Sequence, residues 1–124
     1  FRISDWQRGS LMANEYVPDE GDIVWLSFNP QSGKEQAGHR PALVLTPKSY
    51  NKATGLMVCA PVTTKIKGYP FEVLVELEGT ESAVLSDHLK SLDWQARDAK
   101  FKTSVGSEVL LEVKSKLKPL LGIV

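Results

Sequence analysis

Short apolar runs separated by turn-forming residues dominate the chain as far as about Trp94. In the run from Asp22 to Phe28 (DIVWLSF), the apolar residues Val24, Leu26 and Phe28 recur with a period of two, which places them on one face of a strand. Five further runs are expected to form strands: Pro41 to Thr46, Leu56 to Val62, Phe71 to Leu77, Ala83 to Leu92 and Ala99 to Val105. The pattern therefore predicts a compact barrel of many short strands.

The expected strands differ in how they are bounded and buried. Pro41 and Pro47 bound the second of them. The run from Leu56 to Val62 is continuously apolar, as expected for a strand that is buried on both faces. In the fourth run, two acidic residues lie on one face and three apolar residues on the other: Glu72 and Glu76 opposite Phe71, Val73 and Val75.

The last part of the chain has a helical pattern. From Glu108 to Leu117, the apolar residues Leu110, Val113 and Leu117 recur at helical spacing. Glutamates come early and lysines late, which suits the helix dipole, and Pro119 is expected to end or kink the helix. The sequence thus predicts a mainly β barrel closed by one C-terminal helix.

The chain of 124 residues is 42% hydrophobic and 24% charged, which indicates one ordinary globular domain. We place this domain at residues 12–124. The segment from Phe1 to Leu11 (FRISDWQRGSL) is interpreted as an expression tag or vector-derived extension, since Gly9-Ser10 resembles a cloning scar. A natural N-terminal extension is the alternative.

Neither a signal peptide nor an apolar stretch of membrane-spanning length is evident, so the cytoplasm is the expected compartment. The single cysteine, Cys59, cannot form an internal disulfide. It lies in an apolar run, which predicts a buried, reduced thiol.

Total charge gives no support to a nucleic-acid partner, because 15 basic residues balance 15 acidic ones. The local distribution is uneven. Between residues 72 and 81 there are four acids and no base, whereas residues 34–67 hold one acid, Glu35, and six bases: Lys34, Arg40, Lys48, Lys52, Lys65 and Lys67. A basic face could attract phosphate, and the alternative is a solvated surface with chance clustering.

A long polar connection, Asn29 to Arg40 (NPQSGKEQAGHR), follows the first expected strand. Long loops on a rigid scaffold often carry functional groups. Arg40 precedes Pro41, which favours an extended backbone at the mouth of the next strand. Its planar, permanently charged guanidinium suits a phosphate, although an ion pair with a neighbouring carboxylate such as Glu35 is equally compatible with the sequence.

Four segments together resemble the MazF branch of the MazF/PemK/Kid toxin family. They are PDEGDIVW (Pro18 to Trp25), EQAGHRPA (Glu35 to Ala42), PVTT (Pro61 to Thr64) and KGYPFEV (Lys67 to Val73). Each motif is short, but their order and spacing make chance similarity implausible. The resemblance covers the chain from about Tyr16 to Gly122.

This resemblance implies a homodimer of SH3-like (PemK/CcdB-like) barrels of short antiparallel strands, each with a C-terminal helix. It also implies a ribosome-independent, sequence-specific endoribonuclease (mRNA interferase) that cuts single-stranded RNA without a metal or another cofactor. Such toxins belong to type II toxin–antitoxin pairs. A labile MazE-like antitoxin, whose acidic and partly disordered tail covers the RNA site, holds them inactive.

The resemblance further assigns catalytic roles to Arg40 and Thr63, and an influence on activity to Glu35. Cleavage can use the 2′-OH of the RNA as nucleophile on the adjacent phosphate, which requires proton transfer and positive charge near the transition state. Arg40 would stabilise that charge and act as acid, and Thr63 would hydrogen-bond the phosphate. Glu35 or His39 would assist deprotonation of the 2′-OH.

The residues expected to contact RNA are Lys34, His39, Thr64, Lys67, His88 and Lys90. His88 stands where relatives commonly carry Gln, and a structural histidine is the alternative. Two histidines and one cysteine show no metal-ligand spacing, so no metal site is predicted. Two other functions fit the fold: a gyrase-targeting toxin, and a non-catalytic SH3-like binding module.

Overall fold

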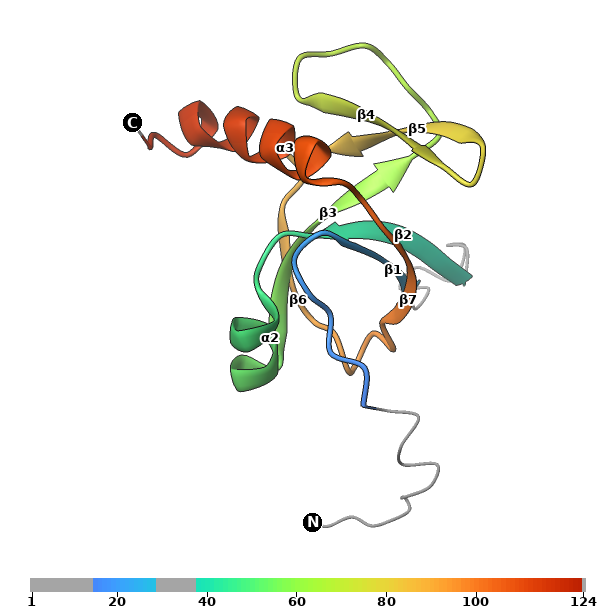
Figure 1. Cartoon of the computed structure of the whole chain (residues 1–124), viewed down its shortest axis with the longest axis vertical. Coiled ribbons are helices and arrows are strands. Elements are labelled where there is room, and N and C mark those ends of the chain that lie inside the picture. Colours follow the sequence, from blue (N-terminus) through green and yellow to red (C-terminus); the bar gives the residue numbers. More distant parts are fainter. Residues whose placement is uncertain (1–14, 29–37, 124) are drawn as a thin grey trace.

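The computed structural model describes residues 15–28 and 38–123 (Figure 1). The elements in these ranges are β1 (Asp22–Phe28), β2 (Gly38–Val44), α2 (Lys48–Thr54), β3 (Leu56–Thr63), β4 (Glu72–Leu77), β5 (Thr80–Leu85), β6 (Lys90–Asp93), β7 (Lys100–Ser104) and α3 (Ser107–Leu120). The expected mainly β fold with a C-terminal helix is confirmed. The segment interpreted as a tag, residues 1–11, lies outside the described residues.

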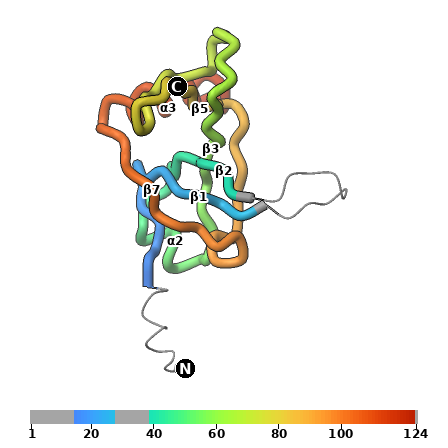
Figure 2. The backbone as a smooth tube through the Cα atoms, turned by 90° about the vertical axis from the view of Figure 1, so that its right-hand side faces the viewer, coloured from blue at the N-terminus to red at the C-terminus, as the bar shows by residue number. Residues whose placement is uncertain are grey.

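The strands follow the order β4-β5-β3-β2-β1-β7, and β6 also pairs with β3. All of these pairs are antiparallel. β3 is the strand common to both parts of the sheet, because it pairs with β6 from Leu56 to Cys59, with β2 from Cys59 to Pro61, and with β5 at Val62 and Thr63. In Figures 1 and 2, β3 leads from the end where α2 lies to the end where β5 and α3 lie.

Two hydrophobic clusters form the core on opposite faces of β1–β3. The first packs against α3 and contains Ile23, Leu43, Leu45, Ala60, Val62, Val73, Leu77, Val84 and Val113. The second contains Val24, Leu26, Ala42, Val44, Met57, Cys59 and Trp94. Consecutive residues of one strand therefore enter different clusters, as alternation across a strand requires, and burial of both faces supplies most of the hydrophobic stabilisation.

Several elements agree with the sequence pattern. Val24 and Leu26 are buried on one face of β1, as predicted, while the side chain of Phe28 lies outside the described residues. β3 is buried on both faces, and β7 coincides with the strand predicted from residue 99 to 105. Cys59 is a buried free thiol, and its burial raises its pKa to about 11.

The predicted C-terminal helix is confirmed as α3. Val113 is fully buried, and Leu110 and Leu117 pack against the first cluster. Pro119 lies inside the last turn, and the helix ends one residue later at Leu120. Among the described residues, no helix is long and apolar enough to cross a membrane.

Two strand predictions were wrong in their limits. Pro41 does not bound β2 but lies inside it, opposite Trp25 of β1. A strand can continue through a proline where its missing N–H is not needed for pairing. The strand predicted from residue 83 to 92 is in fact the end of β5, a turn and β6, because the backbone turns at Ser86 and Asp87.

The sequence pattern also missed α2. This helix has seven residues, ends at Gly55 in a left-handed conformation (φ 76°), and buries Asn51 rather than an apolar stripe. Asn51 Nδ2 donates to the carbonyls of Pro18 and Thr46 at 2.8 and 3.0 Å, and its Oδ1 accepts from the Thr46 hydroxyl at 2.7 Å. Trp94 Nε1 donates to the Asn51 carbonyl at 2.9 Å. We call these four residues the Asn51 network.

Candidate functional site

A cavity of about 450 Å³, here called the site cavity, lies at the end of β3. It is lined by Thr63, Lys65, Lys67, Tyr69, Glu72, Leu85, Asp87 and His88. These residues come from the end of β3, the segment that follows it, the start of β4, and the end of β5 with the turn after it. Three residues that the sequence analysis singled out, Thr63, Lys67 and His88, therefore meet in one place.

Thr63 is half-buried at the last position of β3, where it pairs with Ala83 of β5. Its Oγ1 accepts a hydrogen bond from the backbone N–H of Lys65 at 3.0 Å. A hydroxyl has two lone pairs and one proton, so the Lys65 amide occupies one acceptor position and leaves the proton available. Thr63 can thus donate to an oxygen of a bound anion.

Arg40 is exposed on β2. In the sheet, β2 and β5 lie on opposite sides of β3, the strand that ends at Thr63. β2 and β3 pair in a register that includes Ala42↔Pro61. Continuing this register by two residues places Arg40 opposite Thr63, and alternation along a strand puts Arg40 on the same face as Ala42. This extension of the observed register is the reason to expect the permanent positive charge of Arg40 near the threonine hydroxyl, and the role of the pair stays a prediction.

The segment 64–71, which carries the two lysines of the cavity, is held by its neighbours. Both carboxylate oxygens of Glu72 accept backbone N–H groups, from Lys67 at 2.9 Å and from Gly68 at 2.6 Å. The Tyr69 hydroxyl donates to Asp87 Oδ1 at 2.8 Å, and Lys116 Nζ of α3 donates to the Pro70 carbonyl at 2.7 Å. The cavity wall is thus attached to β4, to the turn after β5 and to α3.

Tyr69 stays protonated over the whole neutral range. Burial of its hydroxyl, its hydrogen bond to Asp87 and the nearby negative charges of Asp87 and Glu72 raise its pKa to about 12. Its hydroxyl proton is committed to Asp87, so Tyr69 contributes an oriented ring to the cavity. Aromatic rings are surfaces on which unstacked bases can pack.

His88 is half-exposed at the rim of the cavity, and its Nε2 lies 3.8 Å from Asp87 Oδ1. The pair is an ion pair only when the imidazole is protonated. With 52% of its side chain exposed, His88 can contact a molecule in the cavity.

Other predicted site residues lie outside the cavity. Thr64 is exposed directly after β3, and His39 is exposed on β2 opposite Ser27 of β1. Lys90 is on β6 opposite Cys59, four positions before Thr63 along β3. Lys34 and Glu35 lie outside the described residues, so their predicted roles remain predictions.

Sequence reasoning did not assign five residues that line the cavity to the site: Lys65, Tyr69, Glu72, Leu85 and Asp87. Lys65 belongs to the basic run noted in the sequence, and this run was the available signal for it. Glu72 was assigned only to a strand face, yet it is just 9% exposed. No local pattern indicates that an acidic residue in a strand will turn its carboxylate to the amides of a preceding loop.

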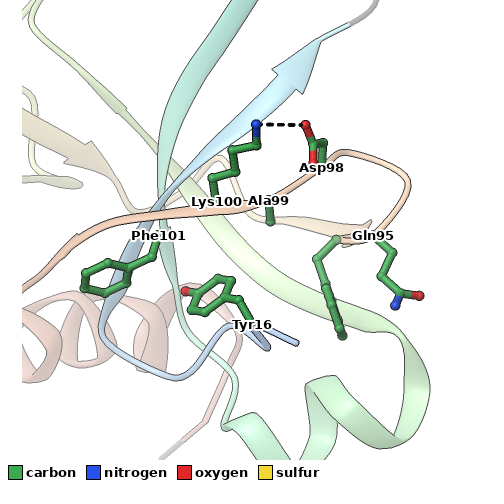
Figure 3. A pocket seen from close by; sticks show the side chains of 7 residues that line it. Tyr16, Gln95, Asp98, Ala99, Lys100 and Phe101 are labelled. Carbon is green, nitrogen blue, oxygen red and sulfur yellow. Dashed lines mark ion pairs between the residues drawn. The ribbon is translucent and has the colours of Figure 1, made fainter. Parts of the chain in front are cut away.

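A second cavity, of about 580 Å³, lies beside β7 and the turn before it (Figure 3). Its lining includes Tyr16 and Phe101, whose rings meet edge to face at a centroid distance of 6.0 Å, and an ion pair between Lys100 and Asp98 at 3.5 Å. Of the residues predicted to act on RNA that the structure describes, none lines this cavity. In the described part of the chain, no group of three or more His, Cys, Asp or Glu side chains is placed to hold a metal ion.

The chain is similar to known proteins over most of its length. The family model described as "PemK-like, MazF-like toxin of type II toxin-antitoxin system" matches residues 19–121. The endoribonuclease toxin MazF of Escherichia coli K12 is 48% identical over 111 residues, which are 90% of this chain and all of that protein. The endoribonuclease PemK of Escherichia coli is 30% identical over 125 residues, covering 94% of this chain and 91% of PemK.

Solved structures support the same relationship. The MazE–MazF structure (Form-II) from Deinococcus radiodurans superposes with a TM-score of 0.83 and 52% identity, covering 89% of this chain and all of that one. The MazF structure (Form-I) from the same organism gives a TM-score of 0.77 and 53% identity, covering 88% of this chain and all of that one. The chain belongs to the PemK-like, MazF-like toxin family of type II toxin–antitoxin systems.

Proposed function

We propose that this protein is an endoribonuclease toxin that cuts single-stranded RNA at short sequence motifs, independently of the ribosome and without a metal, and thereby inhibits translation and growth. The observation that carries the proposal is the site cavity, where Thr63 lies together with Lys65 and Lys67, at the end of a strand that pairs with the strand of Arg40. The relatives described as endoribonucleases, MazF and PemK, support it.

The proposed reaction is an attack of the RNA 2′-OH on the adjacent phosphorus. The new bond from O2′ to phosphorus forms as the bond to the 5′-oxygen breaks, which leaves a 2′,3′-cyclic phosphate on one product and a 5′-OH on the other. Arg40 stabilises the developing negative charge and transfers a proton to the leaving 5′-oxygen. Thr63 donates its hydroxyl proton to a non-bridging phosphate oxygen.

A group must also take the proton of the 2′-OH. We propose Glu35 or His39 for this step. The guanidinium of Arg40 has too high a pKa to act as a base, and the carboxylate of Glu72 already accepts two backbone amides.

RNA binding in this proposal uses lysines and polar residues inside and outside the cavity. Lys67 and His88 line it. Thr64, His39 and Lys90 would contact the RNA outside the cavity, as would Lys34, which lies outside the described residues. Phosphate contacts of this kind position RNA without reading its sequence. RNA affinity should therefore fall as salt concentration rises.

The proposed partners are a second copy of the chain and a MazE-like antitoxin, in the cytoplasm. The Deinococcus radiodurans structures described as MazE–MazF complexes support the second partner. Light scattering of the purified protein would show whether it forms a dimer, and copurification with a MazE-like protein would show whether it binds the antitoxin.

The decisive experiment incubates the protein with a long RNA in EDTA and maps the new ends. We expect cuts at a short motif that leave a 5′-OH and a 2′,3′-cyclic or 3′-phosphate. Replacing the nucleotide just 5′ of the cut by its 2′-deoxy form should abolish cleavage there, since it removes the nucleophile. Cleavage that persists at the deoxy position would show that water attacks. Intact RNA together with gyrase trapped on DNA would assign the protein to the gyrase-targeting toxins.

A further inference from the structure

Glu72 is one of two acidic residues in the lining of the site cavity, which also contains Lys65 and Lys67. It is only 9% exposed, although it begins a strand at the edge of the sheet. Buried carboxylates are uncommon in proteins unless their oxygens are paired. The partners of Glu72 therefore indicate what its burial accomplishes.

Both oxygens of Glu72 are used by two consecutive backbone amides. Oε2 accepts the N–H of Lys67 at 2.9 Å and Oε1 accepts the N–H of Gly68 at 2.6 Å. Gly68 has a left-handed backbone (φ 84°), a conformation that residues with a Cβ rarely adopt. Hydrogen bonds from amides to an ionised carboxylate are stronger than bonds between neutral groups, so this contact fixes the backbone of Lys67.

Other contacts hold a different part of the same segment. Asp87 accepts the Tyr69 hydroxyl and Lys116 donates to the Pro70 carbonyl, so both act on the end of the segment nearest β4. Glu72 acts on Lys67 and Gly68 in its middle. Lys67 is exposed and lines the cavity. Because an exposed side chain has few packing contacts, the position of its ammonium depends on a fixed backbone at Lys67.

We propose that Glu72 is a positioning residue, which holds the backbone of Lys67 so that its ammonium meets a phosphate of the RNA. This inference rests on the proposed RNA-cleaving function. Glu72 itself touches neither the RNA nor the reacting atoms, because its oxygens are directed at the loop amides.

The Glu72→Gln variant replaces one acceptor oxygen by an NH₂ group, which cannot accept from an amide. One of the two loop amides then has no acceptor, and the loop opens more often. Amide exchange at Lys67 and Gly68 should speed up by about tenfold. KM for RNA should rise by about tenfold while kcat stays within about threefold, because Lys67 serves RNA binding and the catalytic pair Arg40 and Thr63 is unchanged.

The test uses the full chain and a matched control, Glu76→Gln, in which the same residue type is changed at an exposed position of the same strand. Hydrogen exchange followed by NMR measures the loop, and steady-state cleavage of a short RNA measures KM and kcat. A double-mutant cycle with Lys67→Ala then separates positioning from general loosening, since the KM effect of Glu72→Gln should largely disappear when the lysine is already absent.

Each result has a distinct consequence. Faster exchange, a raised KM and disappearance of the effect in the Lys67→Ala background support the proposal, whereas unchanged exchange at Lys67 overturns it. A KM effect that persists in full without the Lys67 side chain also overturns it, because Glu72 would then act on the fold as a whole. If the wild-type protein, Glu76→Gln and Glu72→Gln all cleave RNA with the same KM and kcat, this inference fails and the proposed function stands. If the wild type neither cuts nor binds RNA, both fail.

Discussion

The two ends of β3 are built from polar groups in opposite ways. At its start, beside α2, the Asn51 network consists of uncharged groups, and each side-chain hydrogen-bonding atom of the buried Asn51 has a partner. At its end, Thr63 and Lys67 line an open cavity together with charged side chains such as Asp87. The same strand thus ends in a closed neutral network on one side and an open charged surface on the other.

The difference shows which polar residues stabilise the fold and which are available for binding. Burying an amide is tolerable only when its hydrogen bonds are complete, so the Asn51 network joins the segment before β1, the connection after β2 and the turn after β6. Exposed charges contribute little to folding but can interact with a ligand. Substitutions at one end should therefore change stability, and substitutions at the other should change activity.

The largest effect is expected at Arg40. Arg40→Lys keeps a positive charge but has no planar fork, so cleavage should fall by roughly a hundredfold to a thousandfold, nearly as far as in Arg40→Ala. The melting temperature should hardly change because the side chain is exposed. Steady-state cleavage and thermal unfolding measure the two quantities. Near-normal cleavage by Arg40→Lys would show that Arg40 contributes only its charge and that its planar fork is not needed.

The converse substitution is Asn51→Ala. It removes the donor to the carbonyls of Pro18 and Thr46 and the acceptor of the Thr46 hydroxyl, and should lower the free energy of unfolding by roughly 2–4 kcal/mol. Cleavage per folded molecule should stay close to normal. Lys52→Ala, at an exposed position of the same helix, is the control for urea unfolding. Loss of activity without loss of stability would show that the Asn51 network at the start of β3 contributes to activity at its other end.

A smaller loss of activity is expected for Thr63→Val. The change removes the hydroxyl that would donate to the phosphate and also the acceptor of the Lys65 amide. Removal of one hydrogen bond to a charged group should reduce kcat/KM by roughly tenfold to a hundredfold. Thr64→Val, at the exposed neighbouring position, should be milder. If the two variants showed equal activity, the specific role of Thr63 would be untenable.

The smallest effect concerns Ser86, in the turn beside the site cavity. Its hydroxyl is buried and, within the described residues, has no hydrogen-bond partner, in contrast to Asn51. Ser86→Ala removes a desolvated polar atom and should raise the free energy of unfolding by about 1 kcal/mol. Urea unfolding measures the change. A clear destabilisation would mean that the hydroxyl has a partner, and that this end of the molecule also contains a completed polar network.

The sequence by itself determined the elements whose pattern is local. The alternation in β1, the continuous apolar run of β3 and the helical spacing of Val113 with its neighbours each express one element facing a core, and each was predicted. Arg40 and Thr63 were proposed as catalytic residues from motifs that resemble a family, and their roles stay predictions. Their strands are neighbours because β2 pairs with β3, and no local pattern contains that pairing.

Only the tertiary structure decided the rest. α2 escaped prediction because its buried residue is Asn51, whose partners at Pro18 and Trp94 lie 33 and 43 residues away in sequence. The break between β5 and β6, and the burial of Glu72, likewise depend on contacts between distant segments. The periodicity of apolar residues predicts which of them face the core. It does not predict the burial of a polar residue, which depends on hydrogen-bond partners elsewhere in the chain.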